Sequence, residues 1–158
     1  MKKSIKTILL ITITILLSST NIVYSQKESV KDVGFYKNAI HGNVGIGGLY
    51  LTANGYYERM ITQSSKILSF VKVGIGGYST WGDEGNYILG QFGILSGANK
   101  HHLELGAGPR YVTNGNIQGY GPFTATIGWR IQKPGGNFIF RLGASWPEAI
   151  YVGLGFSF

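Results

Sequence analysis

From Asn38 to its last residue, the chain alternates apolar residues with small or polar ones in stretches of about ten residues. The final stretch shows this most clearly, with apolar residues at every second position: Ile150, Val152, Leu154, Phe156 and Phe158. The residues between them are small except for Tyr151. Because successive side chains of a β-strand point to opposite faces, this period of two predicts a strand with one continuous apolar face.

Eight such stretches succeed one another, separated by turn residues. The connections contain Gly, Asn, Ser and Pro, as in residues 82–85 and 134–136, although Gly47-Gly48 leaves almost no loop for the first hairpin. The predicted strands are 39–48, 49–60, 66–77, 86–96, 101–112, 118–132, 137–145 and 149–158. Strands of about ten residues suit a tilted crossing of a bilayer, and an even number with short connections suits an up-and-down barrel. The sequence therefore predicts an all-β fold: a closed antiparallel up-and-down transmembrane β-barrel of eight strands over residues 38–158.

The two faces of these strands differ in composition. One face is aliphatic, and the other carries mainly Gly, Thr, Ser and Tyr with about one charge per strand. A soluble lipocalin-like barrel would put the aliphatic face inside, but the other face has too few charges for a solvated surface. That face suits a narrow lumen filled by side chains, so we expect the aliphatic face to meet lipid. The charged residues predicted to face the lumen are Glu58, Lys72, Glu104, Arg110, Arg130 and Arg141.

Two of these charges flank one turn. Arg130 and Arg141 lie at similar distances from residues 134–136, so pairing would put them opposite each other on adjacent strands. Like charges in that position destabilise a sheet. Glu104, on the preceding strand, occupies a lumen-facing position from which it could contact both arginines. The sequence predicts an Arg130–Glu104–Arg141 cluster that plugs the lumen, so that the barrel is not an open pore.

The alternating last strand that ends in Phe158 resembles the C-terminal strand of outer-membrane β-barrel proteins. The resemblance covers roughly the last ten residues, with similar strands through most of the chain. It implies that Ile150, Val152, Leu154, Phe156 and Phe158 form an assembly signal for the barrel-assembly machinery. It also implies closure of this strand onto the first, and the outer membrane of a Gram-negative-type cell as the location, with outer-membrane lipid as a partner.

The first 25 residues have the pattern of a signal peptide. Lys2, Lys3 and Lys6 precede the short apolar run 8–17, and Val23 and Ser25 stand at −3 and −1 of a cleavage after Ser25. An uncleaved anchor is the alternative, although the run is short for a helix that spans a bilayer. We expect residues 1–25 to be removed, residues 26–37 to form a periplasmic lead-in, and residues 38–158 to form the barrel.

The residue pattern indicates no cofactor or metal site and favours a role other than catalysis. A lipid A deacylase or acyltransferase would need a His with a Ser and an acidic partner in reach. His102 and Glu104 share the lumen-facing parity, but Ser69 falls on the lipid face, and we expect His101 and His102 to decorate a polar turn. Asp83 and Glu84 are expected in a solvated loop, which could also meet a cation or partner. Basic residues are scattered and the formal charge is +7, of which the signal peptide contributes three lysines, so nucleic-acid binding is not expected.

The sequence predicts a structural, adhesive or interaction role for a small outer-membrane barrel. The alternatives are an outer-membrane lipid-modifying enzyme and a soluble ligand-binding barrel. Aromatic girdles at both interfaces would support the membrane interpretation. The residues that could form them are Trp81, Tyr87, Tyr111, Tyr120 and Trp146 at one end and Tyr56 and Tyr57 at the other.

Overall fold

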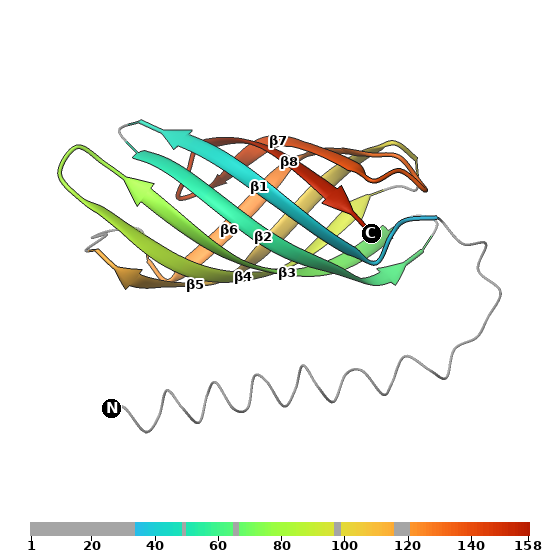
Figure 1. The fold of residues 1–158 in the computed structure, drawn as a ribbon, viewed down its shortest axis with the longest axis horizontal. Helices are drawn as coiled ribbons and strands as arrows, with labels where there is room; N and C mark the ends of the chain where they lie inside the picture. The colour runs from blue at the N-terminus through green and yellow to red at the C-terminus, as the bar shows by residue number, and fades with distance from the viewer. Residues whose placement is uncertain (1–33, 49, 65–66, 97–98, 116–120) are drawn as a thin grey trace, which may run out of the picture. The chain divides into compact units, whose positions relative to one another are not determined.

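The chain forms a closed barrel in which each strand pairs with the next (Figure 1). The computed structural model describes residues 34–48, 50–64, 67–96, 99–115 and 121–158. The strands are β1 (Asn38–Gly47), β2 (Tyr50–Gln63), β3 (Ile67–Ser79), β4 (Glu84–Ser96), β5 (His101–Asn114), β6 (Phe123–Gln132), β7 (Phe138–Trp146) and β8 (Ile150–Ser157). All eight pairings are antiparallel, and β8 returns to pair with β1. The predicted all-β, up-and-down barrel of eight strands is confirmed.

The two ends of the barrel hold different connections. The end that we call the termini end holds the start of β1, the end of β8, and the connections 64–66, 97–100 and 133–137. The opposite end, which we call the far end, holds the connections 48–49, 80–83, 115–122 and 147–149. Among the described residues, none belongs to a helix that is long and apolar enough to cross a membrane.

Several strand boundaries differ from the sequence-based expectation. The predicted turn at 82–85 is wrong, because Glu84 pairs with Ser79 and Gly85 with Tyr78, which leaves the connection at 80–83. A backbone hydrogen bond of 2.8 Å from Thr80 N to Asp83 O closes this turn. The sixth strand starts at Phe123 instead of residue 118, and residues 116–120 lie outside the described part of the chain.

The aliphatic face points outward along every strand. Ile40, Val73, Ile75, Phe92 and Leu105 are among the exposed apolar residues, while Glu58, Lys72, Glu104, Arg130 and Arg141 are buried. The soluble-barrel interpretation placed the aliphatic face inside and is therefore wrong. Leu89 is apolar but buried on the lumen side, in line with the alternation of β4.

Glycine makes room for the large side chains that fill the lumen. A Cβ at Gly74 would lie 3.0 Å from Cε1 of Tyr56, and one at Gly76 would lie 2.7 Å from the ring of Tyr87. Outward glycines differ, since a Cβ at Gly55 would meet nothing within 4 Å. Gly77 lies on the outward side of β3, as Ile75 does, and pairs with Asn86.

The end of the predicted lead-in closes the mouth of the lumen at the termini end. Phe35 is buried and packs in one cluster with Met60, Leu68, Phe70 and Leu95. Gln63 Nε2 donates a 3.1 Å hydrogen bond to the carbonyl of Phe35, which holds the segment across the mouth. Residues 1–33, which include the predicted signal peptide, lie outside the described residues.

Candidate functional site

The lumen next to this apolar mouth is filled by ion pairs centred on Glu104 of β5. Arg141 Nε donates to Glu104 Oε2 at 2.9 Å, and Arg141 Nη2 contacts Oε1 of the same carboxylate. Lys72 Nζ donates to Oε1 at 3.3 Å, and Arg130 Nη1 lies 4.0 Å from Oε2. One carboxylate thus contacts cations from β3, β6 and β7. This accounts for the burial of charges that would be costly without partners.

Glu58 of β2 is the second anion of this network. Arg130 Nη1 donates to Glu58 Oε1 at 2.7 Å. His41 Nε2 lies 3.4 Å from Glu58 Oε2, and its Nδ1 lies 2.9 Å from Arg141 Nη1. Because a guanidinium can only donate, His41 Nδ1 must accept, and the ring proton then sits on Nε2 facing the carboxylate. The histidine therefore connects the two arginine–glutamate pairs.

The arginines lie opposite each other but turn to different anions. Arg130 and Arg141 are direct partners in the β6–β7 ladder, and both are completely buried. Arg130 also donates to Gln132 Oε1 at 3.0 Å from Nε and 2.6 Å from Nη2. Gln132 Nε2 continues the chain of bonds to Ser157 Oγ of β8 at 3.2 Å. Dividing the two anions between the two guanidiniums offsets the repulsion expected of facing like charges.

The structure brings five of the six charged residues predicted for the lumen into this network, which we call the charge cluster: Glu58, Lys72, Glu104, Arg130 and Arg141. Arg110 is buried but lies elsewhere. It is six residues from Glu104 along β5, which corresponds to roughly 20 Å. Its guanidinium lies 5.4 Å from the centroid of the Tyr87 ring, and Nη2 donates to Gly121 O at 3.0 Å. The alternation predicts which face of the sheet a residue occupies, but it does not predict which residues lie at the same height along the barrel axis.

The far half of the lumen holds a second group, the tyrosine cluster, which sequence reasoning missed. Tyr50 and Tyr78 stack with ring centroids 5.7 Å apart, and Tyr78 and Tyr87 stack at 6.5 Å. Tyr56 and Leu89 pack in the same cluster. Tyr56 and Tyr87 were expected in aromatic girdles, and that expectation is wrong. Both residues occupy lumen-facing positions in the alternation of their strands, and this was the feature of the sequence that could have placed them in the lumen.

Glu148 enters this half from the β7–β8 turn, which follows a cis Trp146–Pro147 bond. Glu148 is buried, although it is not in a strand. Its Oε1 accepts from Tyr87 OH at 3.2 Å and from Asn54 Nδ2 at 3.4 Å, and its Oε2 accepts from Ser145 Oγ at 3.0 Å. These donors are neutral, in contrast to the cations around Glu104.

The other two histidines have structural contacts. His102 is buried in the lumen instead of on a polar turn, because its Nδ1 meets Ser96 O at 2.8 Å and its Nε2 meets Gln132 O at 3.3 Å. His101 is exposed and accepts a 3.2 Å hydrogen bond from Trp129 Nε1. Ser69 bonds with Thr62 through their hydroxyls at 2.7 Å. Among the described residues, no three acidic or histidine side chains gather as a metal ion would require.

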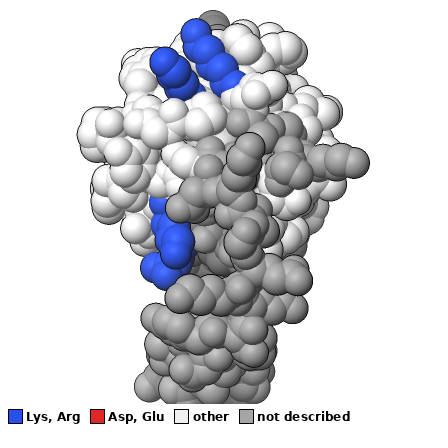
Figure 2. Space-filling model, turned by 90° about the vertical axis from the view of Figure 1, so that its right-hand side faces the viewer, with Lys and Arg blue, Asp and Glu red and all other residues white. Residues whose placement is uncertain are grey.

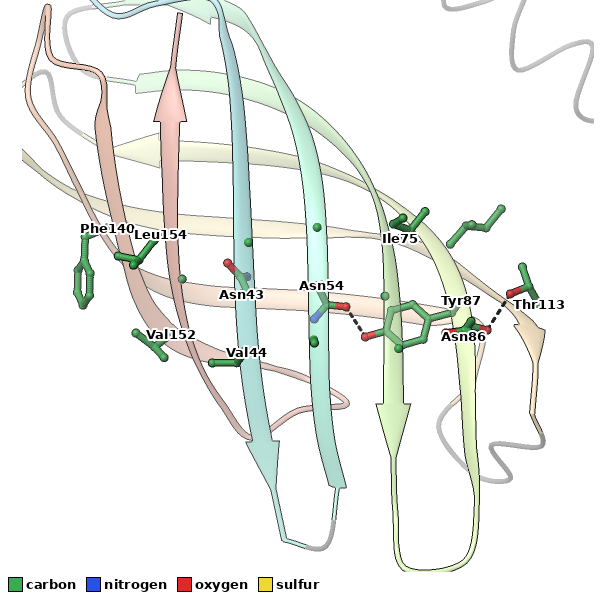
Figure 3. Close-up of a pocket in the computed structure, with 17 residues that line it drawn as sticks. Asn43, Val44, Asn54, Ile75, Asn86, Tyr87, Thr113, Phe140, Val152 and Leu154 are labelled. Carbon is green, nitrogen blue, oxygen red and sulfur yellow. Dashed lines mark hydrogen bonds between the residues drawn. The ribbon is translucent and has the colours of Figure 1, made fainter.

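A hollow of about 910 Å³ lies in the wall around β1, β2 and β3 (Figure 3). Its floor includes the outward residues Gly42, Ala53, Gly55 and Gly77, and apolar residues such as Val44, Ile75 and Leu154 surround it. Figure 3 shows Tyr87 pointing from the lumen side toward Asn54, with their hydrogen bond dashed. The lining thus combines outward apolar side chains with the inward residues Asn43, Asn54 and Tyr87.

The comparisons with known proteins agree with this architecture. No family model matches the chain, and no curated protein matches it in sequence. A solved structure from the de novo design of transmembrane β-barrels is similar, with a TM-score of 0.53 and 17% sequence identity. The match covers 77% of this chain and 95% of that one. This likeness concerns the fold alone, and with the outward aliphatic face it confirms the transmembrane β-barrel fold class.

Proposed function

We propose that this protein is a small outer-membrane β-barrel with a structural or interaction role and a lumen that does not conduct. The observation that carries this proposal is the charge cluster. Its side chains extend from five strands into the lumen and are completely or almost completely buried. An eight-stranded barrel has an interior just wide enough for side chains to fill.

The outer-membrane location is supported by the last strand and by the closing seam. Phe158 N donates to Asn38 O at 2.9 Å and Asn38 N to Phe158 O at 3.2 Å, so the terminal residue completes the β1–β8 pairing. Ile150, Val152, Leu154 and Phe156 are all exposed on the outside of β8. We infer that this register is read as an assembly signal by the barrel-assembly machinery, after removal of residues 1–25 as a signal peptide.

Conductance in a planar lipid bilayer tests the closed lumen. The purified barrel should insert without producing steady channels, because the ion pairs leave no continuous water path. Insertion is checked separately by the different migration of boiled and unboiled samples in SDS, since a closed barrel unfolds slowly without heat. Long-lived channels from a protein that shows this heat shift would contradict the proposal.

Deletion of Phe158 tests the assembly signal. We expect the truncated chain to be lost from the outer membrane while its refolding in detergent stays efficient, because recognition fails more than intrinsic stability. Replacement of the equally outward Phe138, which lies at the start of β7, by Ala is the matched control and should leave insertion intact. Normal membrane levels of the truncated chain would contradict the assembly role.

A further inference from the structure

The exposed basic residues of the described part of the chain all lie at the termini end. They are Lys37, Arg59, Lys100 and Lys133, which we call the basic collar. The other described basic residues, Lys72, Arg110, Arg130 and Arg141, are buried in the lumen. Figure 2 looks at the termini end and shows Lys and Arg on the described surface, with no Asp or Glu in view.

Backbone hydrogen bonds group the collar into two pairs. Met60 N donates to Lys37 O at 2.8 Å, which places Lys37 beside Arg59 at the junction of β1 and β2. Gln132 N donates to Lys100 O at 2.9 Å, which places Lys100 beside Lys133. Two positive sites therefore lie on the rim, one at β1–β2 and the other at β5–β6.

The far end has the opposite character. The residues 48–49, 80–83, 115–122 and 147–149 contain no Lys or Arg in their sequence. Asp83 is partly exposed in the β3–β4 turn, and Glu84 is exposed at the start of β4. The exposed charged side chains of the described residues are thus distributed along the barrel axis, with cations around one rim and side-chain carboxylates at the other.

The collar stands where a bilayer interface would meet the wall. On β6 the outward column runs Ile127, Trp129, Ile131 and then reaches Lys133 just beyond the strand. Trp129 is exposed and held by its bond to His101, beside Lys100. Interfacial Trp residues sit at the headgroup level of membranes, with an apolar band on one side. Lysine and arginine beyond that level lie at the depth of the lipid phosphates.

We propose that the basic collar binds the phosphates of anionic glycerophospholipids in the leaflet around the termini end. This inference rests on the proposed function, because it requires the barrel to span a bilayer. Charge complementarity favours these headgroups: each rim site offers two cations, and the described surface of that end has no exposed side-chain carboxylate. The carboxylates at the far end would not attract the same lipid in the opposite leaflet.

Tryptophan quenching tests this preference. A Trp81→Phe/Trp146→Phe variant keeps Trp129 as the reporter beside the collar, and Trp81→Phe/Trp129→Phe keeps Trp146 at the far end. Both are refolded into phosphatidylcholine vesicles in which about a third of the lipid is phosphatidylglycerol. Either the phosphatidylglycerol or an equal amount of the phosphatidylcholine carries brominated acyl chains.

Brominated phosphatidylglycerol should quench Trp129 more strongly than brominated phosphatidylcholine, while Trp146 should not distinguish them. Each collar residue should favour the anionic lipid by up to about fivefold, the factor that corresponds to about 1 kcal/mol per basic residue at an anionic surface. Lys37→Gln/Arg59→Gln/Lys100→Gln/Lys133→Gln should abolish the preference. Asp83→Asn/Glu84→Gln, at the other rim, is the control that should retain it.

High salt supplies a second measurement that needs no collar variant. Raising the ionic strength to about 1 M shortens the screening length to about 3 Å and should remove the preference of Trp129. Equal quenching by both brominated lipids at low salt would overturn the inference while leaving the proposed function standing. Absence of quenching by either lipid, together with loss of the heat shift in SDS, would show that the barrel does not insert and would overturn both.

Discussion

The two halves of the lumen are filled by different chemistry within the same strand wall. Toward the termini end, Glu58 and Glu104 pair with three cations at 2.7–4.0 Å, apart from the closer contact of Arg141 with Glu104. Toward the far end, stacked tyrosines and the Arg110 guanidinium occupy the space, and Glu148 accepts from the neutral groups of Tyr87, Asn54 and Ser145. The termini half is held mainly by ion pairs, and the far half by stacking, the contact of Arg110 with Tyr87 and hydrogen bonds from neutral groups.

This difference means that equivalent changes have unequal costs. Removing one member of a buried ion pair leaves its partner charged in a medium of low dielectric constant. Removing one member of a neutral hydrogen bond leaves only a polar group without its partner, which is a smaller penalty. Substitutions in the far half should therefore lower the free energy of unfolding less than substitutions in the termini half do.

Glu104→Ala should have the largest effect of the substitutions considered. It leaves Arg141, Lys72 and Arg130 without their shared anion, and we expect a loss of about 3–5 kcal/mol in the free energy of unfolding. Denaturant titration of the refolded barrel in detergent measures it. Leu105→Ala, the outward neighbour, is the control and should cost far less, because its side chain faces the hydrocarbon. Equal losses for the two would mean that the charge cluster does not hold the barrel together.

Glu148→Ala should have an intermediate effect and sharpens the contrast between the halves. We expect a loss of about 1–3 kcal/mol, because Tyr87, Asn54 and Ser145 each lose an acceptor and all three donors are neutral. The same titration measures the loss, with Glu84→Ala as the exposed carboxylate control that should stay within about 0.5 kcal/mol of the original protein. A loss as large as that of Glu104→Ala would break the distinction between the halves.

Gly55→Ala should have the smallest effect, since it changes the wall and not its filling. An added Cβ meets no atom within 4 Å, and alanine in a strand is favoured over glycine by about 0.5–1 kcal/mol. The temperature at which the SDS-resistant form unfolds should be unchanged or slightly raised. Gly76→Ala is the matched inward change, where the Cβ would lie 2.7 Å from the Tyr87 ring, and it should lower that temperature. A drop for Gly55→Ala would show that the outer wall at β1–β3 is packed more tightly than its geometry indicates.

The fold was predictable because alternation and turn chemistry are local properties. The period of two set the strands and their faces, and the turn at 134–136 was enough to place Arg130 opposite Arg141. The less regular segments were predicted less well. Tyr87 was interpreted as part of a girdle from its position near a strand end, although its parity with Leu89 directs it inward.

The sequence by itself determined the eight-stranded barrel, its lipid-facing side and the inward parity of Glu58, Glu104 and the arginines. Only the tertiary structure decided that Arg130 pairs with Glu58 across the lumen, that His41 joins the two pairs, and that Glu148 folds inward from its turn. The physical reason is that alternation acts along a strand and between adjacent strands. Contacts across the lumen depend on the stagger and diameter of the closed barrel, which are properties of all eight strands together.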